Sequence, residues 1–130
     1  MDIKRIIEIE KDNQNRVYLY RGMEEGYCKA YEFSAYLVTK FAGFLKLEEE
    51  PMLEVKDFLY TVKAAPQFIM DRFSGFGVEE SDGCIQFSLY DLTHSAKWRH
   101  EFDLLKEQQR EEHSKLGGFV LGASRLGNNE

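Results

Sequence analysis

The sequence predicts an α/β fold of the α+β kind, with a single mixed β-sheet flanked by about three helices. Apolar and polar residues alternate in short stretches such as 16–21, which is the pattern of a half-buried strand. In 27–41 and 91–115 apolar residues instead recur every three or four positions, which is the pattern of a buried helix face. A chain of 130 residues has the usual length of one domain. We therefore expect a single mixed α/β domain over 1–116 and a partly flexible C-terminal tail over 117–130.

The N-terminal segment 3–9 contains four isoleucines, and β-branched side chains favour a strand. The spacing of the first three isoleucines also fits a short helix. Residues 12–15 are Asp, Asn, Gln and Asn, and they predict a tight turn because Asn and Asp tolerate left-handed backbone. The simplest prediction is a hairpin whose second strand is 16–21.

Helical spacing next predicts an amphipathic helix that starts near Tyr27, runs to about Phe41 and stops at Gly43, a residue suited to a C-terminal cap. Glu24 and Glu25 place negative charge beside the positive end of its dipole. A helix start presents unpaired backbone N–H groups, and this one also presents an aromatic side chain. We therefore expect a functional site at this end. The residues that set the spacing are Tyr27, Ala30, Tyr31, Ser34, Val38 and Phe41.

The middle of the chain predicts strands followed by a helix. Residues 44–47 predict a strand that ends in the acidic run 48–50, and 53–65 predicts one or two further strands because of its β-branched and aromatic content. Pro66 can open the next helix, since its missing N–H costs nothing at the first helical position. That helix is expected to end near Gly75.

A turn over 81–83 leads into a strand over 85–89. The final helix is expected over 91–115, with the polar series 106–112 facing water. Its length and polar face would also suit docking to a partner protein. Its buried face is expected to carry Trp98, Phe102 and Leu105.

The net charge of −6 disfavours sequence-independent binding to nucleic acid, which needs a basic surface to release counterions, although it leaves room for a local basic patch. Cys28 and Cys84 are far apart in the sequence and are expected to be buried thiols in a reducing compartment. The charged residues 1–10 do not resemble a secretory signal, and no segment has the roughly 20 apolar residues that cross a bilayer. We expect a cytoplasmic protein without membrane contact.

No catalytic or metal-binding pattern stands out. His94, His100 and His113 are separated by 6 and 13 residues, so they do not form the stripe that two ligands four residues apart would form. The chain contains no Gly-x-Ser-x-Gly elbow and no dinucleotide-binding glycine fingerprint. We therefore expect a protein that is not an enzyme and that uses neither a metal nor a cofactor.

Strand 16–21, the glycine-bearing turn, the aromatic segment after it, and the Pro66 helix followed by Gly77 and a strand resemble, in this order, the N-terminal mismatch-recognition domain of MutS. The resemblance covers roughly 16–89. In that family a strand ending in Arg leads to a Gly-x-Phe-Tyr-Glu motif at a helix start, and residues 27–35 fall on its register without a gap. No Gly-x-x-x-x-Gly-Lys-Ser/Thr loop is present, so the resemblance does not extend to the MutS ATPase.

The resemblance implies contact with nucleic acid at the helix start. The phenylalanine that wedges beside a mispaired base corresponds to Tyr27, the adjacent tyrosine to Cys28, and the glutamate that contacts the base to Lys29. A base can stack on the Tyr27 ring because stacking needs only a π face, and Lys29 can meet a phosphate. The candidate binding residues are Arg21, Gly26, Tyr27, Lys29 and Tyr31.

We thus expect a non-enzymatic accessory module of MutS domain I-like fold that binds nucleic acid, or a nucleic-acid-processing protein, through Tyr27. Three alternatives stay open. One, ranked last, is an enzyme acting on a small molecule, which a deep pocket containing a carboxylate with a strongly shifted pKa would favour. The tyrosines between 18 and 36 also fit amphipathic core and rim positions that leave their hydroxyls near water. The acidic balance fits a protein-interaction or regulatory subunit with no nucleic-acid contact, which would dock through the helix over 91–115.

Overall fold

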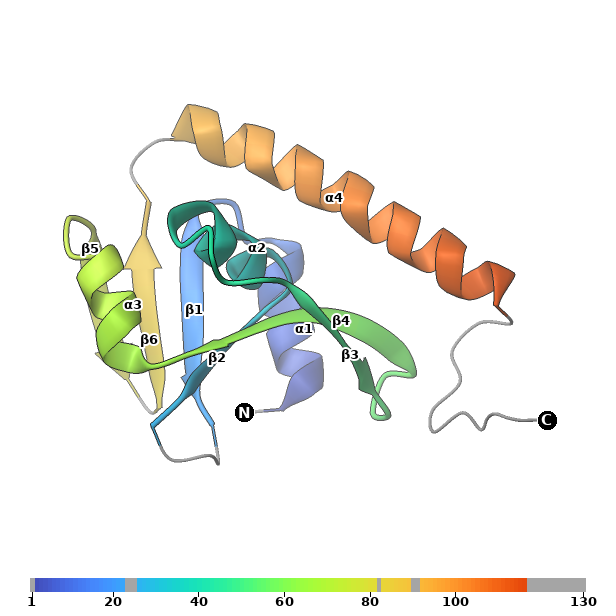
Figure 1. Cartoon of the computed structure of the whole chain (residues 1–130), viewed down its shortest axis with the longest axis horizontal. Helices are drawn as coiled ribbons and strands as arrows, with labels where there is room; N and C mark the ends of the chain where they lie inside the picture. Colours follow the sequence, from blue (N-terminus) through green and yellow to red (C-terminus); the bar gives the residue numbers. More distant parts are fainter. Residues whose placement is uncertain (1, 23–25, 82, 90–91, 117–130) are drawn as a thin grey trace.

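The computed structural model describes residues 2–22, 26–81, 83–89 and 92–116, and over these ranges it contains one six-stranded sheet and four helices (Figure 1). This confirms the predicted α+β class, with four helices in place of about three. The expected tail over 117–130 lies outside the described residues. In chain order the elements are α1 (Ile3–Lys11), β1 (Arg16–Arg21), β2 (Cys28–Tyr31), α2 (Glu32–Phe41), β3 (Glu48–Met52), β4 (Asp57–Ala64), α3 (Pro66–Arg72), β5 (Gly77–Ser81), β6 (Cys84–Ser88) and α4 (Leu92–Lys115).

The strands follow the order β3-β4-β2-β1-β6-β5, and every pairing in this sheet is antiparallel. Strand β1 lies at the centre, where Tyr20 is opposite both Lys29 of β2 and Cys84 of β6. Strand β2 in turn pairs with β4, so that Lys29 is opposite Lys63. The edges of the sheet are β3 and β5.

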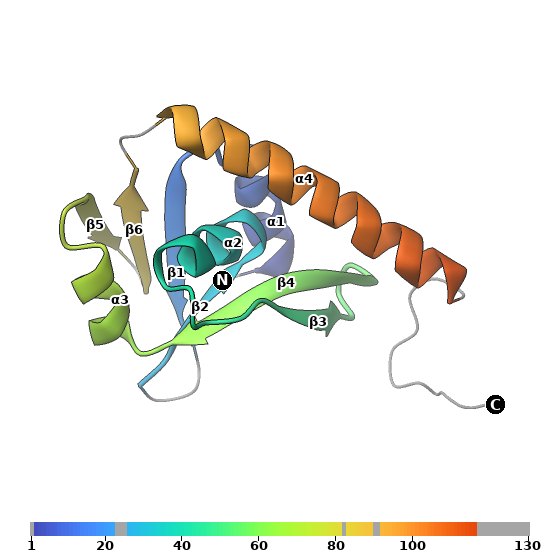
Figure 2. The same cartoon turned by 45° about the horizontal axis from the view of Figure 1, so that its top comes forward.

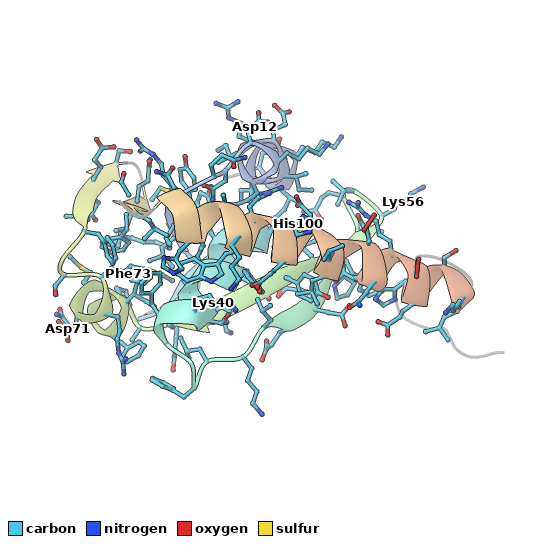
Figure 3. All side chains as sticks on the ribbon, turned by 90° about the horizontal axis from the view of Figure 1, so that it is seen from above. Asp12, Lys40, Lys56, Asp71, Phe73 and His100 are labelled. Carbon is cyan, nitrogen blue, oxygen red and sulfur yellow. The ribbon has the colours of Figure 1, made fainter. Side chains whose placement is uncertain are left out.

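The two faces of the sheet carry different side chains. On one face Val17, Leu19 and Ala30 are buried against α2, α3 and α4, and this cluster forms the main core. On the other face Tyr20 packs against Ile6 of α1. Helix α4 lies across α2 in both views (Figures 1 and 2). Figure 3 looks down on α4 and shows Asp12, which follows α1, on one side of it and Lys40, in α2, on the other.

The first element is a helix and not a strand, so the predicted hairpin over 3–21 is wrong. The Asp2 Oδ1 atom accepts a hydrogen bond from the Lys4 backbone N–H at 3.3 Å and thereby caps α1. Ile6 and Glu10 are buried one turn apart on the same side of the helix. Burial of this helical stripe outweighs the β-propensity of the isoleucines, because propensity is a weak prior beside tertiary packing.

The predicted helix over 27–41 is wrong in its first turn. Residues Cys28–Tyr31 form strand β2, and α2 begins only at Glu32. The backbone of β2 pairs with β1 on one side and with β4 on the other. The apolar residues of this segment fit a helical spacing as well as an extended one, and the long-range pairing decides for the strand. Tyr27 therefore precedes a strand and has no helix N-terminus beside it. The predicted end of the helix at Phe41 is confirmed.

The remaining elements agree more closely. Residues 44–47 are not a strand; the acidic run itself belongs to β3, an edge strand on which Glu48 and Glu49 are exposed. Pro66 does open α3, and the turn before β6 is present, with Gly83 at φ +78°. The final helix is confirmed as α4, with Phe102 buried. Its polar series does not all face water, because Lys106 and Gln109 are buried.

Candidate functional site

Tyr27 lies on the surface at the point where the chain enters β2. Its side chain is 48 % exposed, which is unusual for a ring of this size. Gly26, at φ +84°, gives the chain the left-handed turn that leads into the strand. The Lys63 ammonium lies over the Tyr27 ring, 5.8 Å from its centroid, within the range of a cation–π contact. The partner cation of Tyr27 is therefore Lys63 of β4.

A hollow of about 390 Å³ opens beside Tyr27. Phe44, in the segment between α2 and β3, borders the same hollow and is 63 % exposed. Lys46 and Lys63 also line it, and Glu48 is its one acidic residue among those described. The hollow thus carries two exposed rings and more positive than negative charge. Its full lining is Tyr27, Phe44, Leu45, Lys46, Glu48, Val62 and Lys63.

The aromatic surface continues from Phe44 onto α3. The Phe44 and Phe68 rings meet edge to face with their centroids 5.0 Å apart. The Arg72 guanidinium carbon lies 5.6 Å from the Phe44 centroid and 5.2 Å from the Phe68 centroid, so one cation contacts both rings. We use the term Tyr27 surface for Tyr27, Phe44, Lys46, Lys63, Phe68 and Arg72.

Two cations of the Tyr27 surface are electrostatically uncompensated. Among the residues that the structure describes, neither Lys46 nor Arg72 takes part in an ion pair. Lys46 is exposed, and Arg72 has one further contact, a 3.5 Å hydrogen bond from its Nη1 to the Phe41 carbonyl oxygen. Their positive charge is available to an anion, even though the whole chain is acidic.

The structure separates the predicted site residues. Arg21 forms an ion pair with Glu80 of β5. Lys29 forms one with Glu50 of β3, and the Lys29 Nζ atom lies 2.5 Å from the Glu50 Oε2 atom. Tyr31 is half-buried on the α1 side of the sheet. Its ring packs on that of Tyr20, 5.8 Å away. Of the five predicted residues, only Tyr27 lines the hollow, and Gly26 is its neighbour in the chain.

Sequence reasoning missed the other members of the Tyr27 surface. Phe44 and Lys46 fell in a segment predicted to be a strand, and Lys63 in a strand with no assigned direction. A usable signal exists at Phe44: a large aromatic residue follows the helix-stopping Gly43 and precedes a lysine and the acidic run. The contact between Tyr27 and Lys63 depends on the register in which β2 pairs with β4, and local sequence does not specify that register.

A buried polar cluster lies at the N-terminal end of α2, between this helix and α1. Glu10 of α1 accepts hydrogen bonds from the Ser34 backbone N–H at 2.9 Å and from the Ser34 hydroxyl at 2.6 Å, so it caps the first turn of α2. Asn13 donates to the same carboxylate at 3.2 Å. Burial raises the pKa of Glu10 from its ordinary value of 4.5 to about 7, although these hydrogen bonds oppose the shift. Because the carboxylate is already bonded on both oxygens, its role is structural.

A second buried cluster fixes α4 to the sheet. The Lys106 ammonium lies 3.0 Å from Glu32 and donates to the Phe58 carbonyl oxygen at 3.0 Å. Burial raises the pKa of Glu32, and the charge of Lys106 opposes that effect. Glu32 has φ +52°, a left-handed backbone that is costly for a residue with a side chain. Glu10, Glu32 and Lys106 border a hollow of about 380 Å³ between α1 and α4.

The remaining reactive groups have structural explanations. Cys28 and Cys84 are buried free thiols, and burial raises the pKa of Cys84 to about 11, so it is not an activated nucleophile. The His113 ring stacks on Phe58 at 3.9 Å, and its Nε2 lies 2.9 Å from Glu49. Within the described ranges no group of three His, Cys, Asp or Glu residues is placed to hold a metal ion.

None of the helices, so far as the described residues extend, combines the length and apolar character needed to cross a membrane. Comparisons of the chain with known protein families, with curated proteins and with solved structures found no match.

Proposed function

We propose that this chain is a non-enzymatic, cytoplasmic accessory module that binds nucleic acid through the Tyr27 surface. The observation that carries the proposal is the exposure of two aromatic rings, Tyr27 and Phe44, on one hollow that also presents Lys46 and Lys63. Bases stack on exposed rings and phosphates bind lysine, so this combination suits nucleic acid. Cys28 and Cys84 are both buried and are not joined by a disulfide, which fits a protein of a reducing compartment.

The charge distribution supports a local site and not a broad basic face. The chain as a whole carries −6, and several of its cations are tied to carboxylates, as Arg21 is to Glu80 and Lys29 to Glu50. Lys46 and Arg72 take part in no ion pair among the described residues, and both lie beside exposed aromatic rings. A phosphate can therefore bind at the Tyr27 surface next to a stacked base, and binding should weaken as salt rises.

The resemblance to the first domain of MutS is part of this proposal at Tyr27, although Tyr27 here precedes strand β2 and not a helix. Tyr27, at the position of the wedging phenylalanine, is exposed as a stacking residue must be. Lys29, at the position of the base-contacting glutamate, is already paired with Glu50. We therefore propose stacking at Tyr27 without the mismatch readout of that family.

Fluorescence anisotropy with labelled single- and double-stranded DNA and RNA, at low and at moderate salt, tests the proposal. Tyr27→Ala and Lys46→Glu should each weaken binding about 5-fold or more, because stacking and a phosphate contact are lost. Lys4→Glu on α1 is the matched control, since it changes the net charge equally at an exposed lysine elsewhere. Absence of salt-sensitive binding, or equal losses for Lys46→Glu and Lys4→Glu, would remove the proposal.

A second candidate function is a protein-interaction or regulatory subunit that docks through α4. The favouring observation is the exposure of Leu104, 48 %, on this long helix, whose C-terminal end reaches past β3 and β4 (Figures 1 and 2). A protein that co-purifies with the wild type and with Tyr27→Ala, but not with Leu104→Glu, would favour this function. If the protein partner were lost with Tyr27→Ala and kept with Leu104→Glu, the result would favour the first function, through the Tyr27 surface.

A further inference from the structure

We propose that the Tyr27 surface prefers a single strand to a duplex, and that an unpaired strand runs from Tyr27 across Phe44 to Arg72. This inference rests on the proposed function, which it deepens by naming the class of nucleic acid and the path that it takes. A strand on this path contacts Tyr27, Phe44 and Arg72 in turn. These residues come from three different segments: the start of β2, the segment after α2, and α3.

The first position is the hollow itself. Tyr27 and Phe44 both border it, and its volume of about 390 Å³ is at the small end of the range for ligand sites, roughly 300 to 1,000 Å³. A hollow of this size has room for one splayed base. Lys46 and Lys63 lie at the same hollow, where they meet the phosphate of the inserted nucleotide.

The second position lies on the far side of Phe44. Arg72 contacts both Phe44 and Phe68, and Phe68 meets Phe44 edge to face at 65°. A guanidinium group is planar, so it can stack a base on its open side and contact a phosphate with its N–H groups. Arg72 is exposed and bonded only weakly, to the Phe41 carbonyl oxygen at 3.5 Å. A strand leaving the hollow over Phe44 therefore reaches a second flat, positively charged surface.

The preference for a single strand follows from which base surfaces are accessible. In a duplex each base face is covered by its neighbours, so a ring can stack only on a base that has left the helix, whereas an unpaired strand offers every base face. Duplex binding without base contacts needs many phosphate contacts, and a chain with a net charge of −6 is poorly suited to these. The described surface is rich in rings and has few cations, which favours the single strand.

The test measures affinity for a labelled single-stranded 12-nucleotide DNA, an RNA of the same sequence and the corresponding DNA duplex, with five proteins: wild type, Tyr27→Ala, Phe44→Ala, Arg72→Lys and the control Lys4→Glu. We expect the wild type to bind DNA or RNA single strands at least about 10-fold more tightly than the duplex. Phe44→Ala should weaken single-strand binding at least about 5-fold, and Arg72→Lys, which keeps the charge and removes the plane, should weaken it by a smaller factor.

The outcomes separate the inference from the proposed function. Equal affinity for single strand and duplex, with both weakened by Tyr27→Ala, would overturn the inference and leave the proposed function standing. So would single-strand binding that Phe44→Ala does not affect. Absence of binding to all three probes would remove both. Phe44 and Arg72 are exposed, so unchanged thermal unfolding of their variants is expected and shows that a loss of binding is not a loss of fold.

Discussion

The ammonium of Lys106 lies 3.0 Å from the carboxylate of Glu32, although the two residues are 74 positions apart in the chain. This ion pair connects the middle of α4 to the first residue of α2, and Glu32 also accepts a hydrogen bond from the Tyr60 backbone N–H at 2.8 Å. Both side chains are almost fully buried. A buried pair of this kind fixes how two elements meet, because removing either partner leaves the other charge without compensation.

We therefore expect Lys106→Met and Glu32→Gln each to lower the free energy of unfolding by about 3 to 5 kcal/mol. The double variant should lose clearly less than the sum, because no charge is then left unpaired. Urea unfolding of the four proteins gives the coupling free energy directly. Additive losses would show that the two side chains act independently. Lys97→Met, at an exposed position on the same helix, serves as the control.

The turn between β3 and β4 places Lys56 at φ +51°. Left-handed backbone costs an ordinary residue about 1 to 2 kcal/mol, and glycine avoids this cost at the expense of some unfolded-state entropy. Lys56→Gly should therefore raise the free energy of unfolding by about 0.5 to 1 kcal/mol. The matched control Glu54→Gly, in the same turn but without a positive φ, should lower it. The same sign for both substitutions would contradict the explanation.

The hydroxyl of Tyr20 is buried and has no hydrogen-bond partner among the described residues. An unsatisfied buried polar group is costly, so Tyr20→Phe should leave the free energy of unfolding unchanged or raise it by up to about 1 kcal/mol. Tyr36→Phe is the natural comparison, because the Tyr36 hydroxyl donates to Glu101 at 2.9 Å and its loss should lower the thermal midpoint. Marked destabilisation by Tyr20→Phe would mean that this hydroxyl is bonded in solution.

The sequence predicts the elements whose signals are local. Pro66 marks the start of α3, the alternation over 16–21 marks β1, and the spacing of Trp98 and Phe102 marks α4. Prediction from the sequence fails where the helical spacing and the extended spacing of apolar residues fit the same segment. At 28–31 the helical and the extended pattern both apply, and the choice depends on partners in β1 and β4 that are distant in the chain.

The candidate site is predictable to a similar degree. Tyr27 stands out in the sequence and proves to be exposed, as a binding residue must be. Its neighbours do not follow from the sequence, because the charges of Arg21 and Lys29 are compensated by Glu80 and Glu50 across the sheet. Which cations remain available is a property of strand register, and register is set by the whole fold.

Glu10 should make the stability of the protein depend on pH. Burial raises its pKa from 4.5 to about 7 in the folded state, whereas the unfolded chain releases this proton near 4.5. Between these two values the folded state holds the extra proton, so the contribution of Glu10 to stability is fully present below about pH 4.5 and is lost as the pH rises through about 7. A shift of this size corresponds to roughly 3 to 4 kcal/mol, at about 1.4 kcal/mol for each unit.

Glu10→Gln removes the titration and keeps a bonded side chain, since the amide oxygen can still accept from Ser34 and the amide nitrogen can donate to the Ser34 hydroxyl. The free energy of unfolding of this variant, minus that of the wild type, should therefore rise between about pH 4.5 and 7 and then level off. Urea unfolding at a series of pH values measures this difference. Glu8→Gln, on the exposed side of the same helix, is the control for removing a carboxylate from α1. A flat difference for Glu10→Gln would show that the carboxylate is ionised in the fold, and that its bonds to Ser34 outweigh its burial.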